Sequence, residues 1–142
     1  MGLSALYRQS MLEHARQPHH FGSLDGAQVV ARRSNPLCGD DVEVGVWFDG
    51  ERLTTVSFHG SGCSVCIASG SLMTDAVCGK DRRAVRELVD TMQAWFTIGE
   101  GAAVPATPPS LEALSPVRDF PARRRCVLLA WDALDEALAR LS

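Results

Sequence analysis

The chain has 142 residues, a formal net charge of −3 at pH 7, and 46% hydrophobic and 22% charged residues. This length is typical of one domain that buries a core without disulfide bonds, and the composition is that of an ordinary soluble globular protein. The slightly acidic balance argues against nucleic acid or an anionic membrane as the main partner.

The first half of the chain predicts one helix followed by a small antiparallel sheet. Hydrophobic periodicity predicts, in chain order, a helix, a short edge strand and the two strands of a hairpin, over residues 4–16, 28–33, 42–48 and 52–59. Pro18 ends the helix, and Asp49-Gly50 is a strong signal for the hairpin turn. Gly60-Ser61-Gly62 is expected to break the second strand of the hairpin.

The second half predicts three helices and one long loop. The helices are expected over residues 64–77, 81–96 and 124–141. Residues 97–116 contain two glycines and four prolines, so we expect an inserted loop there without a long regular element. The order of elements predicts an α+β fold over residues 1–142, as a single domain with about three antiparallel strands and helices packed on one side.

No targeting segment is evident in the sequence. Residues 1–17 carry charge throughout and do not resemble a signal peptide, and no stretch is long and apolar enough to span a bilayer. We therefore expect a cytoplasmic protein without a membrane partner. In that reducing compartment its five cysteines favour metal ligands, reactive thiols or buried packing over disulfide bonds.

The predicted hairpin brings potential metal ligands from distant positions to one end of the sheet. Cys38 and Asp40 precede the first strand of the hairpin, and Cys63 follows the second. Cys126 is expected in the first turn of the last helix, where its thiol can point the same way if that helix packs on the sheet. Three thiolates and one carboxylate suit tetrahedral zinc.

Two finer expectations concern this group. Counting back from Asp49-Gly50 pairs Asp40 with His59, and Cys38 with Ser61. A helix N-terminus stabilises a thiolate, so that placement predicts a low thiol pKa for Cys63 and Cys126.

Other interpretations of the cysteines remain open. The three cysteines match no compact zinc-finger spacing, and small buried hydrophobic residues would look the same. Cys63 and Cys66 form a CxxC, but the antiparallel hairpin before it does not favour a thioredoxin-like redox motif. For Cys66 we favour packing over a role as spare ligand or resolving thiol, and we expect Cys78 and His59 to take no part.

Three ordered motifs resemble those of the IscU/NifU-type iron–sulfur assembly proteins. They are Asn35-Pro36-Leu37-Cys38-Gly39-Asp40, the stretch from Gly62 to Leu72 that begins Gly-Cys-Ser-Val-Cys, and Phe120 to Cys126 followed by Leu129-Ala130-Trp131. The N-terminal stretch from Leu6-Tyr7 to Phe21-Gly22 is also similar. Arg125, where the scaffold-type members carry histidine, and the inserted loop resemble the SufU branch.

The resemblance implies a site and a partner. In the SufU branch zinc is held by residues that correspond to Cys38, Asp40, Cys63 and Cys126. The protein docks on a SufS-type cysteine desulfurase, a pyridoxal-phosphate enzyme, whose histidine displaces one thiolate from the metal. Cys38 would then be the catalytic sulfur acceptor, and downstream iron–sulfur assembly components would receive the sulfur.

Three functions follow as alternatives. The first is a zinc-dependent sulfurtransferase-type partner that stimulates the desulfurase. The second is a scaffold on which a [2Fe–2S] cluster is assembled and transferred, since the same thiolates can hold iron; Arg125 argues against it. The third is a structural zinc domain that only mediates contacts.

Overall fold

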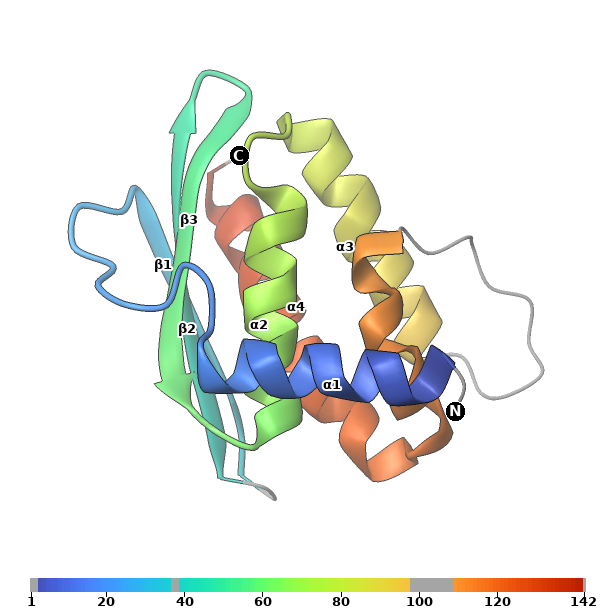
Figure 1. Ribbon diagram of the computed structural model, residues 1–142. Coiled ribbons are helices and arrows are strands. Elements are labelled where there is room, and N and C mark those ends of the chain that lie inside the picture. The colour runs from blue at the N-terminus through green and yellow to red at the C-terminus, as the bar shows by residue number, and fades with distance from the viewer. Residues whose placement is uncertain (1–2, 37–38, 98–108, 142) are drawn as a thin grey trace.

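The computed structural model describes residues 3–36, 39–97 and 109–141 (Figure 1). In chain order the elements are α1 (Leu3–Arg16), β1 (Val29–Asn35), β2 (Asp40–Asp49), β3 (Arg52–Ser61), α2 (Ser64–Val77), α3 (Arg82–Thr97), the 3-10 helix η1 (Pro109–Asp119) and α4 (Pro121–Arg140). No helix among these residues combines the length and the apolar character needed to cross a bilayer.

The three strands form one antiparallel sheet in the order β1-β2-β3. Figure 1 shows the helices on one side of this sheet, with α2 and α4 next to it and α3 further out. The alternation in β2 explains this arrangement, because Val42, Val44 and Val46 are all fully buried on the face that the helices cover. The predicted α+β fold is therefore confirmed.

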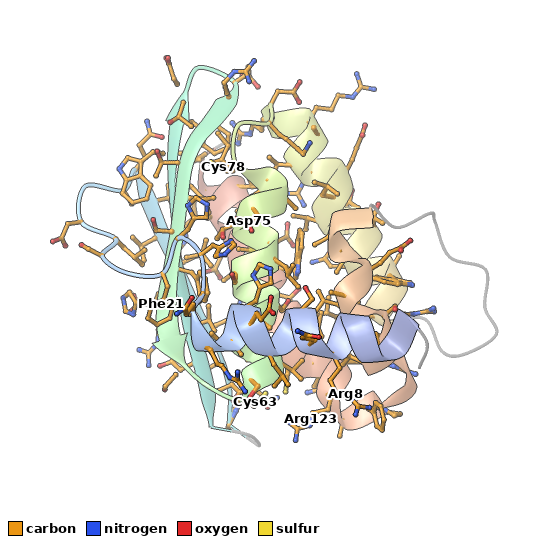
Figure 2. All side chains as sticks on the ribbon, in the orientation of Figure 1. Arg8, Phe21, Cys63, Asp75, Cys78 and Arg123 are labelled. Atoms are coloured by element: carbon orange, nitrogen blue, oxygen red, sulfur yellow. The ribbon has the colours of Figure 1, made fainter. Side chains whose placement is uncertain are left out.

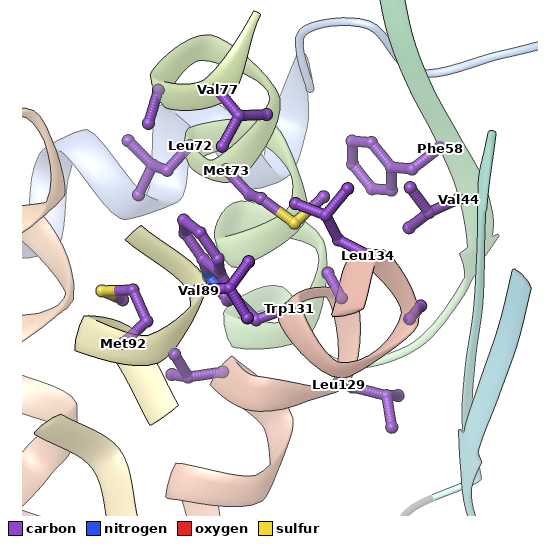
Figure 3. Close-up of a cluster of buried hydrophobic side chains, with 14 of the residues drawn as sticks. Val44, Phe58, Leu72, Met73, Val77, Val89, Met92, Leu129, Trp131 and Leu134 are labelled. Carbon is purple, nitrogen blue, oxygen red and sulfur yellow. The ribbon is translucent and has the colours of Figure 1, made fainter. Parts of the chain in front are cut away.

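The core lies between the sheet and the helices. Figure 3 shows Val44 and Phe58 of the sheet facing Leu134 of α4 and Met73 of α2. All four side chains are fully buried. Because Val44 and Phe58 meet side chains of both inner helices, this packing sets where α2 and α4 stand relative to the strand ends.

The predicted strand register is wrong by three residues. Asp49 pairs with Arg52, so the turn consists of Gly50 and Glu51, and Gly50 has the positive φ of +62° that such a turn requires. A β-bulge between Trp47 and Phe48 adds one further residue. Hence His59 lies opposite Glu43, not Asp40.

The second strand of the hairpin is also longer than predicted. Gly60 and Ser61 do not break it, and Ser61 pairs with Asp41. The glycine is required there because a Cβ at Gly60 would lie 2.0 Å from the carbonyl oxygen of Asp41. Its φ of +154° also lies in a region that side chains disfavour.

The predicted loop is wrong in its last part. Residues 98–108 lie outside the described residues, but 109–119 form η1. Leu111, Leu114 and Val117 recur every three residues, which is the period of a 3-10 helix, and all three are buried. This three-residue spacing of apolar side chains, between the prolines, could have predicted the 3-10 helix from the sequence.

The last helix begins earlier than predicted, at Pro121 rather than at residue 124. Proline suits the first helical position, because it has no N–H to leave unpaired and its φ is already helical. Cys126 therefore lies in the second turn of α4, not in the first.

Candidate metal centre

Three of the four predicted ligands come together at one end of the sheet. Asp40 begins β2, Cys63 is the N-cap of α2, and Cys126 lies on the buried face of α4. One ligand atom from each lies within 4.8 Å of the other two. The fourth, Cys38, lies outside the described residues.

Asp40 is held against the start of α2. Its Oδ1 accepts a hydrogen bond from the backbone N–H of Cys63 at 3.0 Å, and its Oδ2 lies 3.7 Å from the Sγ of Cys63. The Asp40 residue is only 2% exposed. A carboxylate at a helix N-terminus is favoured by the unpaired N–H groups there. This bond fixes the direction in which the carboxylate faces the two sulfur atoms.

Gly62 makes this close approach possible. A Cβ at this position would lie 2.9 Å from the Oδ1 of Asp40 and 3.2 Å from the Sγ of Cys66. Any larger residue would therefore push the carboxylate away from Cys63. The glycine before Cys63 thus has a steric role in the site.

The structure corrects the expected pKa of Cys126. Burial, followed by the hydrogen bonds and negative charges of Asp40 and Cys63, raises the pKa of this thiol far above its ordinary value. The prediction of a low pKa was wrong because Cys126 is fully buried and lies a turn beyond the helix start.

These donors suit a bound cation. Three groups that are negative when ionised lie close together in a largely buried position, so each makes ionisation of the others less favourable. A divalent cation bound among them would offset this mutual repulsion, because its positive charge favours the ionised form of every donor. Two thiols and a carboxylate are donors that zinc accepts.

Arg123 interacts with Cys63 and Cys126, and it was not identified as part of the site from the sequence. Figure 2 shows its side chain near Cys63 at this end of the molecule. The charge of Cys63 and its hydrogen bond, followed by those of Cys126, raise the pKa of the Arg123 guanidinium. The sequence could have indicated this contact, because Arg123 stands three residues before Cys126 on the same helix, a spacing that places two side chains next to each other.

Neither of the other two described cysteines is a member of this donor group, although the Sγ of Cys66 lies close to Gly62, which the carboxylate of Asp40 also approaches. Cys66 is fully buried in α2 and is not one of the three clustered donors. Cys78 lies at the opposite end of α2, with its Sγ 3.5 Å from the carbonyl oxygen of Thr54. His59 forms a partly exposed pair with Glu43, at 3.4 Å between Nε2 and Oε1.

Comparison with known proteins places these residues in a family context. Residues 6–105 match the model of the family described as NifU-like N terminal domain. The chain is 39% identical over 140 residues to a Streptococcus pyogenes serotype M1 protein named iron–sulfur cluster assembly scaffold protein IscU, covering 97% of this chain and 86% of that protein.

Two further relatives carry the name SufU. The Bacillus subtilis (strain 168) protein named zinc-dependent sulfurtransferase SufU is 34% identical, covering 97% of this chain and 92% of that protein. A crystal structure from Fervidobacterium islandicum AW-1, described as a putative scaffold protein for the SUF system, superposes with a TM-score of 0.81 at 26% identity. It covers 96% of this chain and 99% of that chain.

Proposed function

The chain belongs to the NifU-like N-terminal domain family, and we propose that it is a zinc-dependent sulfur acceptor that serves a SufS-type cysteine desulfurase in iron–sulfur cluster assembly. The observation that supports this most is the group of Asp40, Cys63 and Cys126, whose ligand atoms lie within 4.8 Å of one another. A relative with 34% identity is named a zinc-dependent sulfurtransferase.

Cys38 completes the proposed zinc site. It precedes Asp40 by two residues in the sequence, and two residues of chain span about 7 Å at most. With Cys38, the donors are three thiolates and one carboxylate, a set that suits tetrahedral zinc. When bound, zinc supplies the positive charge that keeps these thiols ionised and ties three separate chain segments together.

Cys38 is the proposed sulfur acceptor. Its thiolate attacks the outer sulfur of a persulfide carried by the desulfurase cysteine. A new sulfur–sulfur bond forms on Cys38 while the original one breaks, and the desulfurase cysteine leaves as a thiolate. No external oxidant or reductant is required.

Other residues of the chain support this step. The N–H of Cys63 keeps the carboxylate of Asp40 in place at 3.0 Å. The exposed Arg123, which interacts with Cys63 and Cys126, supplies a positive charge that would attract an anionic persulfide to the site.

The second candidate function is a scaffold for a [2Fe–2S] cluster. The Streptococcus pyogenes relative named as an IscU scaffold is 39% identical to this chain, more than the SufU relative at 34%, and thiolates can hold iron. Arg125 argues against this function, because it is exposed and stands where the resemblance places a histidine in scaffold-type proteins. A guanidinium cannot act as a metal ligand at neutral pH.

A desulfurase assay tests the proposed sulfur transfer and separates it from a purely structural role. A SufS-type desulfurase with cysteine and a thiol reductant should release sulfide faster when this protein is added. Cys38→Ser should abolish the stimulation and the mass increase of one sulfur atom on the chain. The matched control Cys78→Ser should retain both, because Cys78 lies at the far end of α2.

Two results would reject the proposal. One is full stimulation by Cys38→Ser. The other is protein purified without oxygen that carries a coloured iron–sulfur cluster and no zinc. The latter result would support the scaffold instead.

A further inference from the structure

A second group of metal-binding side chains lies away from the cysteines. His14 of α1, His19 after it and Asp75 of α2 each place one ligand atom within 4.8 Å of the other two. Figure 2 shows Asp75 on the open face of α2, well separated from Cys63. At about 1.5 Å per residue, Cys63 and Asp75 are about 18 Å apart along the helix axis. The two groups therefore cannot share one ion.

The turn that carries His19 is held in place by neighbouring elements. The N–H of His19 donates to the Oγ of Ser71 at 2.8 Å, and the Oγ1 of Thr74 donates to the carbonyl of His19 at 3.3 Å. The next carbonyl, of His20, accepts the N–H of Phe58 at 3.0 Å. His20 also has a φ of +56°, which is uncommon for a residue with a side chain. The histidines are thus positioned before any ligand arrives.

His14 is oriented as a metal-binding histidine would be. Its Nδ1 lies 2.6 Å from the Oγ of Ser71. With the proton on Nδ1 and the Ser71 oxygen as acceptor, Nε2 has a free electron pair for a metal. Burial, followed by the charge of His19, lowers the pKa of His14, against the smaller opposing effects of Asp75 and Glu13. The neutral form is the one that binds metals.

We propose that His14, His19 and Asp75 form a second metal site, for a divalent transition ion such as zinc. Two imidazoles and a carboxylate, with water in the remaining position, are a donor set that zinc accepts. His20 is available as a fourth donor, since its Nε2 lies 3.4 Å from the Oδ1 of Asp75.

The position of the site allows an ion to enter. His19 and Asp75 are exposed, and His14 and His19 help to line an open hollow of about 510 Å³ between the end of α1 and the following turn. His19 and Asp75 form a direct pair, at 2.6 Å between Nδ1 and Oδ2, as His59 and Glu43 do at 3.4 Å. What distinguishes the first pair is a third donor of the described residues, His14, within 4.8 Å.

Zinc counting tests the second site. Wild-type protein, the double variant His19→Gln/Asp75→Asn and the control His59→Gln are dialysed against the same micromolar zinc, and bound zinc is measured by mass spectrometry. Wild type and control should each hold one more zinc per chain than the double variant. This difference does not depend on what the cysteines bind. Equal zinc content in all three proteins would overturn the proposal.

Histidine NMR then identifies the ligands. Zinc added beyond the first equivalent should shift the ring signals of His14 and His19 and leave those of His59 in place. The double variant should melt cooperatively without zinc, which shows that it is folded. Equal shifts at His59, or no shifts at His14 and His19, would contradict the assignment.

Discussion

Gly70 of α2 faces the ring of Phe58 on β3 at very close range. A Cβ at Gly70 would lie 2.6 Å from one ring carbon and 2.9 Å from two others. Carbon atoms ordinarily pack at about 3.5–4.0 Å, so Gly70→Ala would require a movement of about 1 Å. The ring of Phe58 is fully buried, which leaves the helix to move away from the sheet.

The expected loss of stability follows from two opposing effects. Overpacking of a core at such short contacts costs about 3 kcal/mol. Alanine is favoured over glycine inside a helix by about 1 kcal/mol. The net loss of about 2 kcal/mol corresponds to a fall in Tm of about 4–8 °C for a chain of this size.

The same movement should weaken the proposed zinc site. Cys63 caps α2, whereas Asp40 belongs to β2, so separating helix and sheet lengthens the 3.0 Å hydrogen bond between them. Zinc affinity should fall together with stability, although Gly70 itself touches no ligand among the described residues.

A double-mutant cycle with thermal melting tests this reasoning. Phe58→Leu removes ring atoms that obstruct a Cβ at Gly70, so the double variant should be destabilised by less than the sum of the two single changes. If Gly70→Ala is as stable as wild type, or if the two changes simply add, the helix does not approach the sheet as closely as described.

Three further predictions concern single side chains. Asp40→Asn should weaken zinc binding more than tenfold, because loss of even an outer-shell partner of a metal ligand costs roughly tenfold or more in affinity. Competition with a chelator measures the zinc affinity, and Asp41→Asn should leave that affinity unchanged, because Asp41 pairs with Arg32 at the surface. Cys66→Ala should cost about 1 kcal/mol of stability, as for other small truncations of a core side chain. It should leave desulfurase stimulation unchanged, because Cys66 is not a member of the donor group. A folded variant that no longer stimulates the desulfurase would show that Cys66 has a chemical role. For Asp135, burial acts to raise the pKa, but the hydrogen bonds from Arg86 and Gln93 and nearby arginine charges leave it below the ordinary value. The ionised Asp135 therefore stabilises the folded state at pH values above its unfolded-state pKa, and this stabilisation is lost as the pH falls through its folded-state pKa. Wild type should therefore be more stable than Asp135→Asn by under about 1 kcal/mol near neutral pH, because the group is partly exposed. The Tm difference between the two proteins should be largest there and should shrink in acid. A Tm difference that grows in acid would contradict this reasoning.

Local patterns in the sequence were sufficient for most of the fold. The alternation of Val42, Val44 and Val46 determines both a strand and its buried face, because side chains alternate across a strand. Helical spacing likewise identified the helices, and the hairpin was enough to bring Asp40 and Cys63 to one end of the sheet. Each of these inferences depends on residues close together in the chain or on a single turn.

Only the tertiary structure decided the register, the environment of Cys126 and the second group of donors. A bulge at Trp47 shifts every pairing beyond it, and nothing in the local alternation signals it. The pKa of Cys126 depends on burial and on Asp40, 86 positions away in the chain. His14 and Asp75 meet because α1 crosses α2, a contact that depends on how two helices pack and not on the sequence of either one.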